Sequence, residues 1–287
     1  MKPAYFAYRR AESLGDAFAL LGAHAGARLL AGGQSLIPSL NLRLSQPEML
    51  IDISRLGELR GIREGADGVT IGALTRHVDI ERSAEIARLL PAMVEAARAI
   101  AHPAIRNRGT LGGSLALADP AAEWPAAALA FDMSLTLASV RGERVVRAGD
   151  FFRGLFETAL EEDEVLTQVH VPLPAAGAQA VFGELTRRGG DYAIVGAFVN
   201  ARLAGGVLAG TRVAYFGVAA KPVLAVNVMA ALDGTSGDAT AVAVAAAHLE
   251  ADLDPIADLY NKRATKLHLS RVLLGRLVAR LVAHLVA

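Results

Sequence analysis

Hydrophobic and polar positions in the first 55 residues alternate between short extended runs and helical spacing. Residues 4–8 (AYFAY) predict a strand, and 13–24 (SLGDAFALLGAH) predict a helix that Ser13 is placed to cap. The segments ARLL, SLIPSLNLRL and MLIDIS continue the series as strand, helix and strand, with a glycine loop after the first of them. This order predicts a βαβαβ unit, whose ligands are expected at the carboxyl ends of the strands, where Gly32 and Gly33 fall.

From residue 57 the pattern changes to hairpins and longer helices. A first hairpin is expected around the turn GADG (65–68), and Thr75 is placed to cap a short helix after it. Residues 83–101 have a helical period, which Pro91 must bend or split in two. MSLTLASV and GERVVRAG predict a second hairpin, and 164–174 (EVLTQVHVPLP) a strand that ends in prolines.

The segment PLPAAGAQA (172–180) is the one convincing linker, so we place a domain boundary near residue 177. This gives a first domain at 1–176, with subdomains at about 1–55 and 56–176, and a second domain at 177–287. The second domain opens with three strand-like segments and ends in predicted helices at 222–233, 238–249 and 262–286. Strands followed by helices predict an α+β arrangement.

Composition narrows the function. The 29 basic and 29 acidic residues cancel, so no net field attracts nucleic acid or an anionic membrane. The chain has no cysteine, which excludes disulfides, thiolate zinc sites, a cysteine nucleophile and cysteine-bound iron–sulfur clusters within it. Any redox role must therefore use a bound organic cofactor.

The chain shows no secretory h-region and no run of 18 apolar residues, so we expect a cytoplasmic protein without a membrane span. Its hydrophobic content of 53% is slightly high, which fits either surface buried against another subunit or an alanine-rich source genome.

Two glycine pairs, in LLAGGQSLIP and RGTLGGSL, share one pattern: a small polar residue and a helix-compatible run follow each pair. Each alone is typical of an ordinary turn, and neither is a Walker A or a Rossmann loop. Together they fit a pyrophosphate, because backbone N–H groups free of Cβ atoms approach its oxygens closely. The hydroxyls of Ser35, Thr110 and Ser114 can add hydrogen bonds.

Two further residues have two interpretations each. Tyr192 follows a Gly-Gly turn and can either cover a flat ring or pack at the edge of the core. Glu123 can accept hydrogen bonds from ribose hydroxyls or can be a charge at a helix N-terminus. Trp124 is expected to anchor the core.

Other polar residues show no strong motif. Arg106 and Arg108 can support a phosphate loop or pair with acidic neighbours. The seven histidines have no metal-binding spacing, so we expect surface or capping residues and no metal site. No G-x-S-x-G elbow is present, and we expect no catalytic side chain.

The ordered set AGGQSL, IAHPAIRNRGTLGGSLALADPAAEWPA, EVL and RRGGDYA resembles the FAD-binding medium subunit of molybdenum hydroxylases, nearly end to end. That family includes carbon monoxide dehydrogenase, nicotine dehydrogenase and the flavin domain of xanthine dehydrogenase. The resemblance implies an α+β fold: a two-subdomain FAD-binding domain of the vanillyl-alcohol-oxidase/PCMH type, followed by a C-terminal domain of antiparallel sheet plus helices.

The resemblance also implies a set of FAD contacts. The pyrophosphate contacts would be Ala31, Gly32, Gly33, Gln34 and Ser35 in the first loop and Thr110, Leu111, Gly112, Gly113 and Ser114 in the second, with Leu36 as a further cofactor contact. Glu123 would contact the ribose or adenosine, Leu166 would lie beside the adenine, and Tyr192 would shield one face of the isoalloxazine.

Two positions depart from common family patterns. Many members carry Lys where Thr186 stands, and carbon monoxide dehydrogenases tend to have His where Gln34 stands. The second difference favours a heterocycle or aldehyde as the hydroxylated substrate.

The function that the resemblance implies is electron transfer. FAD would collect electrons from [2Fe–2S] clusters of a small partner subunit and pass them to NAD⁺, oxygen, a quinone or another acceptor. Hydroxylation would occur at a molybdopterin on a large subunit, in a dimer of heterotrimers. A stand-alone FAD-dependent oxidase or reductase of similar fold is the alternative, and a scaffold that has lost FAD is a third possibility.

Overall fold

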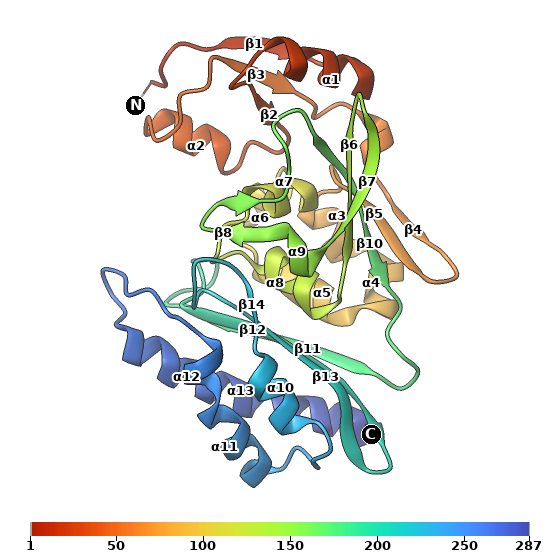
Figure 1. The fold of residues 1–287 in the computed structure, drawn as a ribbon, viewed down its shortest axis with the longest axis vertical. Helices are drawn as coiled ribbons and strands as arrows, with labels where there is room; N and C mark the ends of the chain where they lie inside the picture. The colour runs from red at the N-terminus through yellow and green to blue at the C-terminus, as the bar shows by residue number, and fades with distance from the viewer. Residues whose placement is uncertain (1, 287) are drawn as a thin grey trace.

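The computed structural model describes residues 2–286, which form three parts along the long axis of the molecule (Figure 1). Each part contains its own main β-sheet, and the chain passes through the parts in order. The mixture of helices and sheets confirms the predicted α+β class, including the antiparallel sheet with helices at the C-terminal end.

The N-terminal part is the predicted βαβαβ unit. Its elements are β1 (Ala7–Arg10), α1 (Leu14–Ala23), β2 (Arg28–Leu30), α2 (Leu36–Asn41) and β3 (Met49–Asp52). Both β1 and β2 pair in parallel with β3, giving the strand order β1-β3-β2. All four residues of β3 are buried, as expected for the central strand of a parallel sheet. The loop that contains the first glycine pair therefore leaves the sheet at the carboxyl end of β2.

The middle part holds an antiparallel sheet of order β4-β5-β10-β6-β7. Its strands are β4 (Ile62–Glu64), β5 (Gly68–Gly72), β6 (Ser134–Ser139), β7 (Gly142–Arg147) and β10 (Val165–Pro172). A 3₁₀ turn (Gly57–Leu59) precedes β4, and a small two-stranded sheet joins β8 (Phe152–Gly154) to β9 (Glu157–Thr158). Both predicted hairpins are confirmed, because β4 pairs with β5 and β6 pairs with β7.

Short helices complete the middle part. They are α3 (His77–Arg82), α4 (Ala84–Leu89), α5 (Pro91–Ala99), α6 (Pro103–Arg106), α7 (Leu111–Leu117), α8 (Glu123–Ala130) and α9 (Ala148–Phe151). The helical stretch 83–101 is split at Pro91, as predicted, since proline starts α5 at its first position. The predicted cap at Thr75 is wrong: α3 begins one residue later, after Arg76. The Thr75 hydroxyl instead bonds the backbone of Gly61.

The C-terminal part contains an antiparallel sheet of order β11-β12-β13-β14. Its elements are β11 (Gln179–Leu185), β12 (Val195–Ala204), β13 (Val207–Phe216), β14 (Val223–Leu224), α10 (Val226–Leu232), α11 (Ala239–Ala247), α12 (Leu249–Asp252) and α13 (Arg263–Val286). The short strand β14 was missed because it lies in a segment predicted as the start of a helix.

One hydrophobic core joins the middle and C-terminal parts. Strand residues alternate between two faces, so Val181 packs under α13 while its neighbour Phe182 joins the core of the middle part. Phe198 and Phe216 lie on the same side as Phe182, and α5 and α8 pack against that face. Because this contact is apolar and continuous, side chains on this face of the sheet have a defined position relative to α8.

Candidate functional site

The first glycine loop lies between β2 and α2. Gly33 has a φ of +72°, a left-handed conformation that glycine adopts without steric cost. The Gln34 side-chain amide donates to the carbonyl of Gly32 at 3.1 Å, so it closes the loop on itself. Among residues 2–286, no acceptor receives a hydrogen bond from the N–H groups of residues 32–36. The first loop therefore presents a row of free backbone donors.

The backbone N–H groups of the second loop already donate hydrogen bonds to other groups of the protein. The N–H groups of Leu111 and Gly112 donate to the carbonyls of Thr75 and Ala73 at 3.0 and 2.8 Å. Thr110 caps α7, and its hydroxyl accepts from the Gly113 N–H at 3.1 Å. The Ser114 N–H donates to the carbonyl of Thr110. The sequence pattern predicts that both loops offer N–H groups, but in the structure the second loop offers side-chain hydroxyls instead.

The two loops meet in space, as their shared pattern suggested. A Cβ added to Gly32 would lie 2.3 Å from the Arg108 carbonyl oxygen and 2.8 Å from the Gly109 Cα. A Cβ on Gly113 would lie 3.8 Å from the Cβ of Ala31 and 2.7 Å from the Thr110 hydroxyl oxygen. Gly32 is therefore needed for the close approach of the first loop to the backbone that leads into the second.

Tyr192 lies in the loop between β11 and β12, and 71% of it is exposed. Enclosure of its hydroxyl, together with the charges of Asp119 and Glu123, raises the pKa of this phenol. Because most of the side chain is exposed, the aromatic ring is available to a ligand. Of the two interpretations of Tyr192, packing at the core edge fits poorly with this exposure.

Glu123 is the first residue of α8, and its carboxyl is poorly solvated. Burial, together with the negative charges of Glu184 and Asp119, raises the pKa of Glu123 to about 8. Burial also raises the pKa of Asp119, whose side chain accepts a hydrogen bond from the Ala121 N–H at 2.9 Å. The site therefore combines an exposed aromatic ring with several carboxyl groups that resist ionisation.

Trp124 is fully buried, as expected of a core anchor. Its indole N–H donates to Nδ1 of His77 at 3.0 Å. Burial, assisted by the charge of Arg106, lowers the pKa of His77 to about 4. The expectation that every histidine is a surface or capping residue is wrong for His77, which is only 5% exposed. The His77 ring also contacts the Gly109 backbone, because a Cβ there would lie 2.6 Å from Nε2.

The side chains of the remaining candidates have other positions or partners, although the backbone of Arg108 takes part in the contact between the loops. Arg106 pairs with Glu81 at 2.9 Å and donates to two backbone carbonyls, so it follows the acidic-neighbour interpretation. Arg108 is exposed and Thr186 is half-buried. Leu166 is 5% exposed in β10, on which α7 packs.

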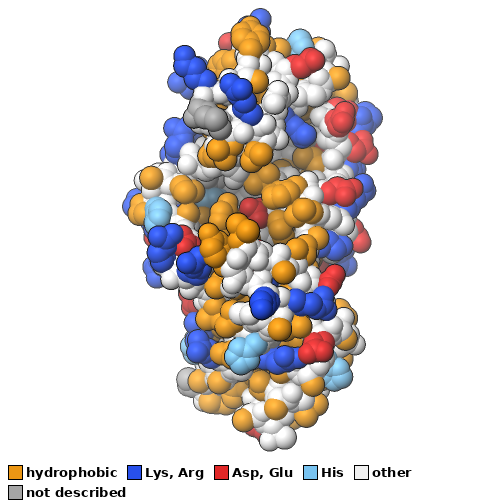
Figure 2. Space-filling view, turned by 90° about the vertical axis from the view of Figure 1, so that its left-hand side faces the viewer, with side chains coloured by type: hydrophobic (Ala, Val, Ile, Leu, Met, Phe, Trp, Pro, Cys, Tyr) orange, Lys and Arg blue, Asp and Glu red, His pale blue; other side chains and the backbone are white. Residues whose placement is uncertain are grey.

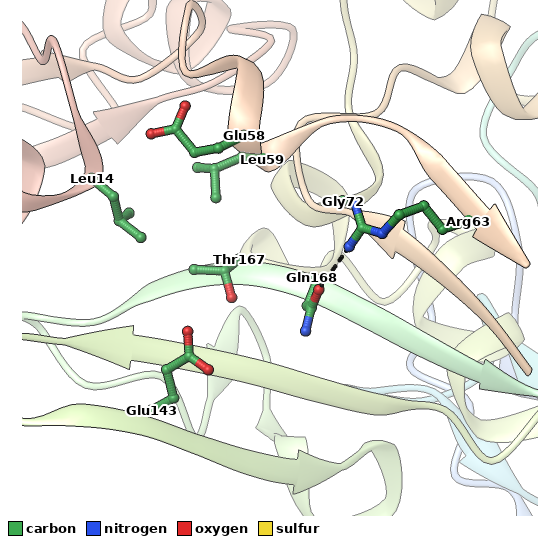
Figure 3. Close-up of a pocket in the computed structure, with 8 residues that line it drawn as sticks. All are labelled: Leu14, Glu58, Leu59, Arg63, Gly72, Glu143, Thr167 and Gln168. Atoms are coloured by element: carbon green, nitrogen blue, oxygen red, sulfur yellow. Dashed lines mark hydrogen bonds between the residues drawn. The ribbon is translucent and has the colours of Figure 1, made fainter. Parts of the chain in front are cut away.

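The molecular surface is hollowed where the N-terminal part meets the middle part, as expected for a ligand-binding site. Figure 2 shows a hollow between the uppermost part of the molecule and the middle, bordered by hydrophobic side chains and containing an acidic one. A separate recess, drawn in Figure 3, lies among Leu14, Glu58, Arg63 and Gln168, where Arg63 donates to Gln168 at 3.2 Å. None of the expected FAD contacts lines that recess.

Residues 2–286 contain no group of three or more His, Asp or Glu side chains placed to bind a metal ion. Within the same range, no helix has the length and apolar character needed to cross a membrane.

Comparison with known proteins assigns the family. Residues 4–174 match the FAD binding domain in molybdopterin dehydrogenase, and residues 180–281 match the CO dehydrogenase flavoprotein C-terminal domain. The chain belongs to the FAD-binding medium subunits of molybdenum hydroxylases. This medium subunit is thus the FAD-binding component of a multi-subunit oxidoreductase family.

Individual relatives agree with the assignment. The medium chain of a glyceraldehyde dehydrogenase from Sulfolobus acidocaldarius is 41% identical over 79% of this chain and 81% of the relative. A 6-hydroxypseudooxynicotine dehydrogenase subunit alpha from Paenarthrobacter nicotinovorans is 47% identical over 69% of this chain and 67% of the relative. A solved structure of carbon monoxide dehydrogenase from Hydrogenophaga pseudoflava is 40% identical, covers 99% of both chains, and superposes with a TM-score of 0.96.

The residues present fit FAD. The first loop offers free N–H groups. A side chain at position 32 would push the two loops apart, and glycine avoids this. Sequence reasoning missed three side chains of this region: His77, Asp119 and Glu184. Asp119 had a signal, since it precedes Glu123 by four residues near a helix start. Glu184 also had one, because it is the one charged residue of β11.

Proposed function

We propose that the first loop (residues 31–36) and the second loop (residues 110–114) together bind the FAD pyrophosphate. The observation that carries this proposal is the contact at Gly32, where one loop with free N–H groups touches the backbone leading into the other. Backbone N–H groups without a protein partner favour an anionic ligand, and small residues let that ligand approach. The hydroxyls of Ser35, Thr110 and Ser114 add polar contacts at the same place.

We further propose that Tyr192 lies over the isoalloxazine and that Glu123 and Leu166 contribute to the rest of the cofactor site. Exposure of the Tyr192 ring supports the first assignment, because an aromatic face excludes water from one side of a flat ring. Leu166 is already buried, so it offers only an edge to an adenine. The domain limits at 1–176 and 177–287 belong to the same proposal, with Tyr192 supplied to the site by the second domain.

When bound, FAD would supply the redox chemistry of electron transfer from a partner to an acceptor. This chain binds the cofactor, orients the ring and limits its contact with water. We infer that the [2Fe–2S] clusters and the molybdopterin reside on a small and a large partner subunit, since the 287 residues contain no cysteine to ligate a cluster. A dimer of such heterotrimers in the cytoplasm, with NAD⁺, oxygen or a quinone as acceptor, completes the proposal.

For the substrate we propose an aldehyde or a nitrogen heterocycle rather than carbon monoxide. The relatives named for glyceraldehyde, 6-hydroxypseudooxynicotine and caffeine support it. Gln34 also supports this proposal, because carbon monoxide dehydrogenases tend to have histidine at this position. The Gln34 amide donates to the Gly32 carbonyl and so helps to set the shape of the first loop.

The test begins with the purified chain. Titration of the apoprotein with FAD should quench flavin fluorescence and saturate at one FAD per chain. The complex with both partner subunits should then reduce an artificial acceptor when given an aldehyde or heterocycle. Carbon monoxide as the preferred substrate would contradict the substrate proposal, and substrate turnover by the isolated FAD-loaded chain would contradict the subunit role in favour of a stand-alone enzyme.

A further inference from the structure

Tyr192 lies in a segment that other parts of the protein contact on both sides. The first contact is at Gly190, which has a φ of +83°. A Cβ there would lie 3.0 Å from the Ala101 carbonyl oxygen and 2.6 Å from the His102 ring. Arg106 donates to the same Ala101 carbonyl at 3.1 Å, so the surface that Gly190 touches is itself held in place. The segment thus begins against the middle part of the fold.

The second contact is at Gly217, which directly follows β13. Its φ is +78°, and a Cβ there would lie 2.8 Å from the Ile194 carbonyl oxygen and 3.1 Å from that of Ala193. These neighbours are backbone atoms, which cannot rotate away as a flexible side chain can. A side chain at position 217 would therefore displace the chain one and two residues after Tyr192.

Hydrogen bonds fix the position of Gly217 from two directions. Its N–H donates to the Pro120 carbonyl at 2.8 Å, in the turn that precedes α8. Its carbonyl oxygen accepts from Nζ of Lys266, in the first turn of α13, at 3.1 Å. Gly217 thus joins the turn before α8 and the start of α13 to the backbone that carries Tyr192.

The side chain of Lys266 is almost enclosed by protein. The residue is 8% exposed, and its ammonium contacts the Asp258 carboxylate at 3.1 Å in addition to the Gly217 carbonyl. An ammonium in such a place is tolerated because it is paired and hydrogen-bonded. The Asp258 side chain is 42% exposed, so water can solvate it if the ammonium is removed. Loss of the ammonium therefore acts chiefly on the Gly217 carbonyl.

We propose that Gly217 and Lys266 are positioning residues that hold the backbone after Tyr192, so that the tyrosine ring is in place to cover the flavin before FAD binds. This proposal rests on the proposed role of Tyr192. The Tyr192 side chain is 71% exposed, so its position depends mainly on its backbone. Among residues 2–286, no hydrogen bond joins Gly217 or Lys266 to either glycine loop. Their loss should uncover the flavin with little effect on FAD affinity.

The first test replaces Gly217 by alanine, with Gly210 of β13 as the matched control. Both glycines are left-handed, with φ of +78° and +64°, so alanine strains the backbone at both. A Cβ at Gly210 meets no atom within 4 Å, whereas the one at Gly217 meets the backbone after Tyr192. Uncovering one of the two faces of a flat ring about doubles its accessible area. Iodide quenching of bound-FAD fluorescence should therefore increase about twofold in Gly217→Ala and stay at the wild-type level in Gly210→Ala.

The second test removes only the ammonium. Lys266→Met keeps an apolar stem, and Lys262→Met, at an exposed position, is its control. Lys266→Met should bind FAD within about threefold of the wild type but show increased iodide quenching, while Lys262→Met should match the wild type in both. The double variant Tyr192→Ala/Lys266→Met should be quenched no more than Tyr192→Ala alone, because Lys266 acts through Tyr192. A lysine with a general structural role would add to the exposure of the flavin in the double variant.

A third measurement needs no FAD. The Ile194 N–H donates to the Leu185 carbonyl at 2.8 Å, so it should exchange slowly with solvent deuterium in the apoprotein. Its exchange should be faster in Gly217→Ala and Lys266→Met than in their two controls.

Wild-type quenching in both Gly217→Ala and Lys266→Met, or extra quenching in the double variant, would overturn the proposal. Unchanged exchange of the Ile194 N–H in both single variants would overturn it even if FAD does not bind. Failure of the wild type to bind FAD would separately contradict the proposed function.

Discussion

Replacement of Gly32 by alanine tests the contact between the two loops. The new Cβ would lie 2.3 Å from the Arg108 carbonyl oxygen, whereas ordinary contact begins at 3.4 Å, so the loops must separate by about 1 Å. Backbone is on both sides of this contact, and no flexible side chain can move away. Overpacking of this kind costs about 1–3 kcal/mol. Loss of one charge-assisted hydrogen bond costs about 1.5–3 kcal/mol, which weakens FAD binding by about tenfold to a hundredfold.

The assay is quenching of flavin fluorescence, with thermal unfolding of the apoprotein measured in parallel. Two control variants separate the loop contact from general glycine effects. Gly22→Ala lies within α1 with no atom in reach of the new Cβ, and it should bind FAD normally. Gly26→Ala has a φ of +77° and open space, so it should lose stability without losing FAD affinity. Binding of FAD to Gly32→Ala within about twofold of the wild type would refute the reasoning.

Three other changes have defined outcomes. Gly33→Ala forces a left-handed alanine, which should cost about 1–2 kcal/mol of stability and lower FAD occupancy, and normal occupancy would count against the first loop. Tyr192→Ala should leave the unfolding temperature nearly unchanged but expose the bound flavin to iodide quenching, whereas unaltered quenching would remove Tyr192 from the ring site. His77→Leu should destabilise the protein by about 1–3 kcal/mol in urea unfolding, because the buried Trp124 N–H loses its acceptor. The wild type should lose stability as the pH falls from 6.5 toward 4, since His77 stays neutral when folded but binds a proton when unfolded, and an equally steep loss in His77→Leu would contradict this origin.

Local signals predicted the elements of the fold well. Ser13 caps α1 and accepts from the Asp16 N–H, and Pro91 opens α5, because both effects depend only on neighbouring backbone. The strand patterns identified both hairpins for the same reason. Thr75 shows the limit of such signals: its hydroxyl satisfies the backbone of Gly61, a contact that depends on how the turn before β4 meets the chain after β5.

The site was predictable only in part. The pairing of the glycine loops followed from their shared pattern, and the structure brings them together at Gly32. The pattern did not predict that only the first loop has free N–H groups. The N–H groups of the second loop donate to the carbonyls of Ala73 and Thr75, which come from a turn distant in the sequence. The buried partnership of His77 with Trp124, and the proximity of Glu184 to Glu123, likewise depend on packing between elements far apart in the sequence.

The most direct test of the central claim is a crystal structure of the FAD complex at a resolution that places the phosphates. We predict that the pyrophosphate oxygens accept hydrogen bonds from N–H groups of residues 32–36, while the N–H groups of Leu111 and Gly112 keep their bonds to Thr75 and Ala73. A pyrophosphate placed away from the first loop would contradict the account.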